Sequence, residues 1–178
     1  GVQTCALPIS SGIDNTVVTY ENPVYFKRRQ PHNLIETFLP ARPVRLLVGD
    51  TGIRSATRLV VGDVRQQWQV ERERFEQLFA ACGHIADDAR RALQSGEIES
   101  LGMLMDENHA LLQRMGVSSS ELDTLVAAAK FAGALGAKMS GAGRGGNMIA
   151  LVTEKRERGI YEALYTAGAQ SVITTVLR

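Results

Sequence analysis

The sequence predicts an α+β fold in which helices pack on one face of an antiparallel sheet, as in a ferredoxin-like (split βαβ) sandwich with extra helices. The expected elements follow one another in the order strand, helices, strand, strand, helix, strand, which is the order that a split βαβ unit requires. Hydrophobic residues make up 44% of the 178 residues, enough to fill the core of one domain and part of another.

Short β-branched and aromatic runs open this order. Residues 16–20 and 24–26 are expected to be strands around a turn at residues 21–23, which predicts a hairpin. Residues 29–43 hold three prolines among polar residues and are expected to be a connection. Residues 44–48 form an apolar strand that ends in a turn at residues 50–52.

Apolar residues then recur at helical rather than strand spacing. Ser55 is the expected N-cap of a helical stretch that reaches residue 93, with a break at residues 82–84 that separates two helices, and Gly96 ends the second. A third helix is expected over residues 98–115. The side chains expected to face the core include Leu59, Val60, Phe75, Leu78, Phe79, Met103, Met105 and Met115.

The remaining elements frame a glycine-rich stretch. Gly116 stops the third helix, and the serines at 118–120 with Glu121 offer an N-cap and a capping-box acid for a fourth helix that reaches residue 135. Residues 137–139 and 148–152 are expected strands. A helix over 154–167 and a strand over 171–177 complete the chain.

The glycine-rich stretch sets four glycines within residues 141–146. It satisfies the pattern G-x-G-x-x-G, but the dinucleotide-binding form of that pattern must open a helix. Here an apolar strand follows, and no Gly-Lys-Ser/Thr follows any glycine run, which excludes a Walker P-loop. We interpret the stretch as a phosphate cradle whose consecutive N–H groups form an anion-binding nest. The alternative is a permissive turn, since glycine reaches positive φ at no steric cost.

A small-residue turn at residues 11–15 presents Asp14 just ahead of a β-branched run. Taken alone, this turn is an Asx-turn or a helix N-cap. Together with the glycine loop it resembles the GHMP kinases, small-molecule kinases named for galactose, homoserine, mevalonate and phosphomevalonate, and within them the mevalonate kinase family. The stretches that carry the resemblance are residues 11–15, 46–52, 105–118 and 138–147.

The resemblance implies a role for each matching residue. Asp14 falls on the catalytic aspartate, as general base or orienting acceptor for the acceptor hydroxyl, and Thr51 is expected on the substrate side. Gly12 and Asn15 are expected beside the substrate and shape the turn around Asp14. The residues expected to line the ATP phosphates are Ser140, Gly141, Ala142, Gly143, Arg144, Gly145 and Gly146.

The resemblance also implies a domain organisation. Residues 11–43 are expected to be a remnant of the GHMP N-terminal domain with its connection, and residues 44–178 the GHMP kinase C-terminal domain. Residues 1–10 are interpreted as a sequencing artefact, because the chain lacks an initiator Met and residues 1–9 read as a translated sequencing adapter. The ligands of Mg²⁺ and the main phosphate loop are then expected in a missing N-terminal part.

The expected activity is ATP-dependent phosphorylation of the mevalonate hydroxyl to phosphomevalonate in isoprenoid biosynthesis, with the fragment inactive alone. The alternatives are another GHMP kinase, acting on phosphomevalonate or a sugar, and a non-catalytic ferredoxin-like ligand-binding module. The expected partners are mevalonate and ATP, with a homodimer left open.

Composition excludes several other classes. A net charge of +1 gives no bias towards nucleic acid or anionic membrane, and no apolar stretch approaches the roughly 18 residues of a membrane span. Cytoplasm is therefore the default location. Cys5 and Cys82 cannot form a metal-ligand set, and the three histidines lack ligand spacing, so no metal site is predicted. Cys82 is expected to be a small core residue rather than a nucleophile.

Overall fold

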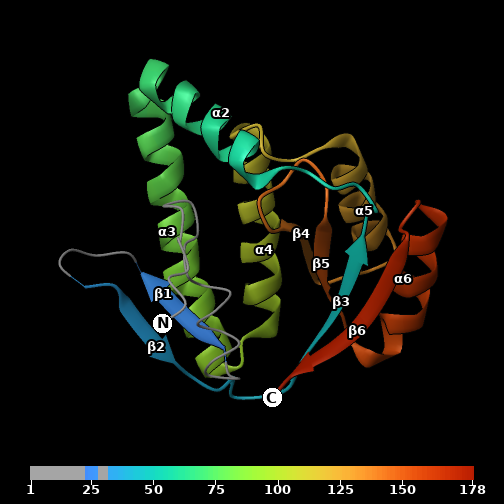
Figure 1. The fold of residues 1–178 in the computed structure, drawn as a ribbon. Coiled ribbons are helices and arrows are strands. Elements are labelled where there is room, and N and C mark those ends of the chain that lie inside the picture. Colours follow the sequence, from blue (N-terminus) through green and yellow to red (C-terminus); the bar gives the residue numbers. More distant parts are fainter. Residues whose placement is uncertain (1–22, 28–31) are drawn as a thin grey trace, which may run out of the picture.

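A computed structural model of the chain describes residues 23–27 and 32–178 (Figure 1). Its centre is a four-stranded antiparallel sheet in the order β4-β5-β3-β6. The bounds of these strands are Gly136–Ser140 (β4), Asn147–Leu151 (β5), Val44–Asp50 (β3) and Ser171–Leu177 (β6). Helices connect β3 to β4, and α6 (Glu154–Thr166) connects β5 to β6, so the first strand lies between the third and the fourth. The predicted ferredoxin-like fold is confirmed.

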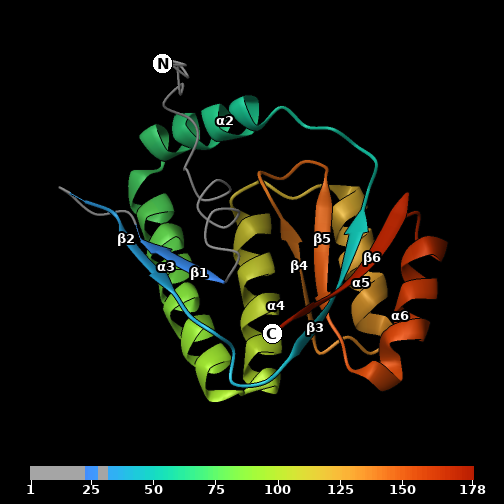
Figure 2. The same cartoon turned by 60° about the horizontal axis from the view of Figure 1, so that its bottom comes forward.

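Two helices cover one face of this sheet. They are α5 (Ser120–Phe131) and α6, which Figures 1 and 2 both place on the same side of the strands. Leu47 of β3 is fully buried in the core beneath them, together with Leu164 of α6. On the opposite face Ile173 of β6 is 61% exposed. The alternation along β3 and β6 therefore places the main core between the sheet and α5–α6.

A third helix, α4 (Ile98–Arg114), runs along the free edge of β4 (Figure 2). The approach is close because both backbones carry glycine at the contact. A Cβ on Gly102 would lie 2.4 Å from the carbonyl oxygen of Leu135, and a Cβ on Gly136 would lie 2.2 Å from that of Gly102. Any larger residue would push the helix away from the strand.

Side chains of α4 occupy the hydrogen-bonding positions that a further strand would fill. Asp106 Oδ1 accepts the N–H of Ala137 at 2.9 Å, and His109 Nδ1 accepts the N–H of Met139 at 3.3 Å. These are alternate residues of β4, whose outward N–H groups would otherwise remain unpaired at a buried edge. The helix thus closes the edge of the sheet and fixes the strand that leads into the glycine loop.

The helices before α4 form an outer layer. They are α2 (Thr57–Val70), which packs on α3 (Arg72–Ser95), and α3 in turn packs along α4. The predicted break at residues 82–84 is wrong, because these residues lie inside α3 and the chain turns at Glu71 instead. The Cβ position of Gly83 meets nothing within 4 Å, and a helix of 24 residues tolerates the cost of about 1 kcal/mol for one exposed glycine.

Other helix boundaries differ by a few residues. The first helix has Ala56 rather than Ser55 at its N-cap, and the fourth helix is capped by Ser119, whose hydroxyl accepts the N–H of Leu122 at 3.4 Å. That helix ends at Phe131 rather than near residue 135, because Gly133 adopts a φ of 99° and turns the chain into β4.

The expected core positions are confirmed in part. Phe75, Leu78, Met105 and Met115 are buried. Three expected core residues are exposed instead, at 67% for Leu59, 41% for Phe79 and 66% for Met103. These three residues lie on sides of α2, α3 and α4 that the neighbouring described elements leave uncovered, so they meet solvent.

The first two strands form a sheet of their own. Val24–Lys27 (β1) pairs antiparallel with Leu34–Thr37 (β2), so the expectation that residues 29–43 hold only a connection is wrong. This small sheet packs on α3, where the Tyr25 hydroxyl donates to Asp87 and the Arg90 guanidinium lies 4.3 Å from the Tyr25 ring centre. The predicted strand at 16–20 lies outside the described residues, and the division into domains at residue 43 stays a prediction.

No helix within the described ranges, 23–27 and 32–178, combines the length and the apolar character that a membrane crossing needs.

Candidate phosphate-binding site

The glycine loop joins β4 to β5, and its backbone is left-handed at almost every residue. The φ angles are 95° at Gly141, 94° at Gly143, 55° at Arg144, 133° at Gly145 and 79° at Gly146. Glycine adopts such angles without a steric penalty, whereas other residues do so at a cost. The predicted arrangement of strand, glycine loop and strand is confirmed.

Two neighbouring turns hold the loop in place. The N–H of Arg144 donates to the carbonyl of Val117 at 2.8 Å, in the turn between α4 and α5. The N–H of Gly146 donates to the carbonyl of Ile53 at 2.8 Å, in the turn after β3. The carbonyl of Gly146 accepts both the N–H and the hydroxyl of Thr51, each at 2.9 Å. The loop is therefore fixed at its tip and at its exit.

Two of the glycines are also required by the closeness of those turns. A Cβ on Gly143 would lie 1.9 Å from the Val117 carbonyl oxygen, and a Cβ on Gly145 would lie 2.5 Å from the Ile53 carbonyl oxygen. At Gly141 and Gly146 a Cβ would meet nothing within 4 Å. One side of the loop is thus packed against protein, and the other side is open.

Several N–H groups of the loop have no acceptor among the described residues. Within the part of the chain that the structure describes, the amides of Gly141, Ala142, Gly143 and Gly145 donate no hydrogen bond. Amides clustered in a turn of this kind attract anions, because their dipoles add up to a positive concavity. The geometry therefore suits a group with several negative oxygens, such as a phosphate.

Arg144 lies at the rim of the loop. It is the one non-glycine residue with positive φ in the described ranges, at 55°. Its Nε donates to the carbonyl of Gly116 at 3.2 Å, and its guanidinium forms an ion pair with Asp63 of α2, with 36% and 47% of the two side chains exposed. Asp63 was not predicted, because nothing local in the sequence links it to a residue so far along the chain.

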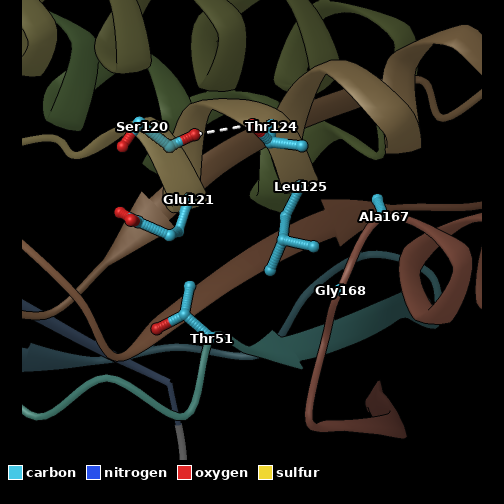
Figure 3. A pocket seen from close by; sticks show the side chains of 7 residues that line it. All are labelled: Thr51, Ser120, Glu121, Thr124, Leu125, Ala167 and Gly168. Atoms are coloured by element: carbon cyan, nitrogen blue, oxygen red, sulfur yellow. Dashed lines mark hydrogen bonds between the residues drawn. The ribbon is translucent and has the colours of Figure 1, made fainter.

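Thr51 has a structural use in this arrangement. It is only 8% exposed, its hydroxyl donates to Gly146, and the same oxygen accepts the N–H of Ile53 at 3.2 Å. It also lines an open cavity of about 360 Å³ between the start of α5 and the turn before β6, where the Leu125 side chain extends towards it (Figure 3). The contact between Thr51 and a substrate stays a prediction.

A second, apolar cavity of about 220 Å³ lies on the other side of β4 and is lined in part by Lys138 and Cys82. The Lys138 ammonium donates to the carbonyl of Met139 at 2.9 Å, and burial lowers the pKa of this lysine. Burial raises the pKa of the Cys82 thiol, with the nearby Lys138 and Asn108 opposing the change. A raised thiol pKa disfavours a nucleophilic role, in agreement with the sequence prediction.

Three predicted site residues, Asp14, Gly12 and Asn15, lie outside the described residues, so their roles stay predictions. Among residues 23–27 and 32–178, no three His, Cys, Asp or Glu side chains gather as a metal site would require.

The family GHMP kinases C terminal matches residues 89–170, a range that contains α4, α5, the glycine loop and α6. This part of the chain is a GHMP kinase C-terminal domain. Mevalonate kinase of Pyrococcus furiosus is 36% identical over 174 residues, which are 95% of this chain and 50% of that protein. Mevalonate kinase of Pyrococcus horikoshii is 37% identical over the same shares. The chain spans about half the length of the curated relatives it matches.

Solved structures agree with this membership. The crystal structure of L. major mevalonate kinase in complex with R-mevalonate matches with a TM-score of 0.90 and 34% identity, over 95% of this chain and 53% of that chain. Streptococcus pneumoniae phosphomevalonate kinase, in complex with phosphomevalonate and AMPPNP, matches with a TM-score of 0.79 at 17% identity, over 93% of this chain and 56% of that chain. At this identity, the similarity to the phosphomevalonate kinase concerns the fold alone.

Proposed function

We propose that this chain is the C-terminal part of a mevalonate kinase, which transfers the γ-phosphoryl group of ATP to the hydroxyl of mevalonate. The observation that carries the proposal is the glycine loop. Its open amides lie in a domain of the GHMP kinase family, and the two most similar proteins named above are mevalonate kinases.

In this proposal the loop binds and orients the phosphate end of the nucleotide. The amides of Gly141, Ala142 and Gly143 donate to phosphate oxygens, and the guanidinium of Arg144, which is paired with Asp63, helps to hold the loop in place. Phosphoryl transfer depends mainly on positioning and on stabilising charge, because the transferred group carries several negative oxygens through the transition state. A loop fixed by the flanking turns supplies both without reorganisation.

Asp14 completes the proposed mechanism on the acceptor side. The mevalonate hydroxyl oxygen forms a bond to the γ-phosphorus while the bond from that phosphorus to the bridging oxygen of ADP breaks. The hydroxyl proton passes to the Asp14 carboxylate, or is held by it, as the oxygen becomes the nucleophile. A bound Mg²⁺ would neutralise charge on the phosphates.

The proposal is tested with a chimaera in which residues 11–178 replace the aligned half of the Pyrococcus furiosus mevalonate kinase. ADP release is followed with mevalonate, phosphomevalonate, galactose and homoserine as acceptors. We expect turnover with mevalonate, loss of turnover by several orders of magnitude in Asp14→Asn, and none from the 178-residue chain alone.

Three results would contradict the proposal in different ways. Turnover with another acceptor but not with mevalonate would assign the chain to a different GHMP kinase. Unchanged turnover in Asp14→Asn would remove this carboxylate from the mechanism. Turnover by the parent P. furiosus enzyme but no ATP use by the chimaera would favour a ligand-binding module.

A further inference from the structure

His109 is one of two polar residues that are buried in the described part of the chain, and the proposed mechanism does not use it. It lies on α4 with 6% of its surface exposed, and it contacts β4 and α5. A buried imidazole needs partners for both ring nitrogens, since each unpaired polar group in the core costs free energy.

The partners define the tautomer. Nδ1 accepts the N–H of Met139 at 3.3 Å, so Nδ1 carries no proton and the proton of the neutral ring lies on Nε2. Nε2 lies 3.2 Å from Oδ1 of Asp123, in the first turn of α5, which is an electrostatic contact without the geometry of a hydrogen bond. The same carboxylate oxygen accepts the hydroxyl of Ser118. A continuous series of polar contacts therefore runs from β4 through His109 and Asp123 to the turn between α4 and α5.

Both ends of this series reach the glycine loop. Met139 directly precedes Ser140, where the loop begins. Ser118 directly follows Val117, whose carbonyl accepts the N–H of Arg144 at 2.8 Å and lies against Gly143. One imidazole is therefore linked to the entry and to the tip of the loop, although its own chain segment is remote from both.

We infer that His109, oriented by Asp123, is a positioning residue that fixes the glycine loop in its phosphate-binding conformation and does so only as the neutral Nε2–H tautomer. That the ligand is a phosphate rests on the proposed function. The contacts that link His109 to the loop do not depend on it. Protonation of Nδ1 would direct an N–H at the N–H of Met139, which removes the hydrogen bond and makes the contact repulsive.

The charges that face His109 come from three elements. Burial lowers the pKa of this histidine, and Lys138 of β4 lowers it further. Asp123 of α5 and Asp106 of α4 oppose this change by favouring the charged form. Burial has the largest effect, so the imidazole remains neutral at physiological pH. The loop is then fixed at pH 7 and is released as the pH falls below the ordinary histidine value of 6.5.

A first measurement uses the wild-type chain. Long-range ¹H–¹⁵N spectra of the imidazole identify the tautomer, and a pH titration follows His109 protonation together with amide exchange at Met139. We expect the Nε2–H tautomer at pH 7 and, after correction for the intrinsic pH dependence of exchange, lower protection of the Met139 amide as His109 becomes protonated. An Nδ1–H tautomer, or protection that does not follow the titration, would overturn the inference.

A second measurement uses a matched pair of variants. His109→Asn keeps an acceptor oxygen near the position of Nδ1, whereas His109→Leu fills the space without one. We expect Met139 exchange to rise about tenfold in His109→Leu and much less in His109→Asn, since the loss of one hydrogen bond from a buried donor costs on the order of 1.4 kcal/mol, which corresponds to tenfold.

Binding of inorganic triphosphate, detected at the amides of Gly141, Gly143 and Gly145, reports on the loop itself. We expect affinity about tenfold weaker in His109→Leu than in His109→Asn. Equal affinity and equal Met139 exchange in the two variants would overturn the positioning role. If triphosphate leaves the wild-type amides unchanged, the proposed phosphate function fails, and the tautomer and the Met139 exchange still decide the role of His109.

Discussion

Gly141 and Gly143 provide a matched test of the way the glycine loop is packed. Their φ angles are 95° and 94°, so an alanine at either position would be held at the same positive φ. Their surroundings differ. A Cβ at residue 141 meets nothing within 4 Å, whereas a Cβ at residue 143 lies 1.9 Å from the Val117 carbonyl oxygen and 3.1 Å from Cε of Met139. The difference between Gly143→Ala and Gly141→Ala therefore isolates the contact with Val117.

The magnitude follows from these distances. Both substitutions place a non-glycine residue at positive φ, which costs roughly 1–3 kcal/mol. In Gly143→Ala the Val117 carbonyl must also move by about 1 Å to reach a normal contact, which costs roughly 1–3 kcal/mol as overpacking. That movement weakens the 2.8 Å hydrogen bond from Arg144, worth about 1 kcal/mol. We expect Gly143→Ala to be less stable than Gly141→Ala by about 2–4 kcal/mol.

Urea unfolding followed by far-ultraviolet circular dichroism measures this difference in the free energy of unfolding. The comparison requires equal m-values for the two variants, which shows that both unfold from equally compact states. Equal loss of stability in both variants would refute the reasoning, because it would mean that the loop and the Val117 turn move apart freely.

Three further predictions follow from other contacts. Gly102→Ala should lower the free energy of unfolding by about 2–4 kcal/mol, because its Cβ would lie 2.4 Å from the carbonyl oxygen of Leu135, just before β4. Gly83→Ala, whose Cβ would meet nothing within 4 Å, should raise the free energy of unfolding by about 0.5–1 kcal/mol. Calorimetry that ranks the two variants in the opposite order would contradict the close contact between α4 and β4. Arg144→Gly should change the free energy of unfolding by less than about 1 kcal/mol, because glycine relieves the strain of the positive φ while the partly exposed ion pair with Asp63 is lost. A loss of stability above about 2 kcal/mol would assign that ion pair a larger role. Cys82 should react with iodoacetamide more slowly at pH 8 than an unstructured cysteine peptide, because burial raises the pKa of its thiol and lowers the thiolate fraction. Equal rates of alkylation, measured by mass spectrometry, would show that the thiol is open to solvent.

Local sequence patterns were enough for several elements of this fold. The strand at Ser171–Leu177 lies where alternation and β-branched residues predicted it. Gly96 and Gly116 end the second and third helices with φ angles of 77° and 72°, as glycine at a helix C-terminus predicts. The glycine loop was located in the same way, because four glycines between two apolar runs indicate a loop that joins two strands. Each of these signals depends on neighbouring residues alone.

The errors have a common origin in packing. The turn between the first two helices lies at Glu71 rather than at Gly83, because propensity at one exposed glycine is weaker than the contact of a long helix with α4. Leu59 is exposed although its spacing is helical and apolar, because among the described elements α2 packs mainly on α3 and Leu59 lies away from that contact. Periodicity predicts that a helix has an apolar side, but not how much of it a neighbour covers.

The sequence by itself determined the fold class, the position of the phosphate loop and the resemblance to the GHMP kinases. Only the tertiary structure decided which partners hold that loop, namely Val117, Ile53 and Thr51. The ion pair between Arg144 and Asp63, and the contact of His109 with Met139, likewise appear only once the helices are packed against the sheet. The physical reason is that these contacts join residues far apart along the chain, and no local pattern of hydrophobicity or glycine content specifies which distant groups will meet.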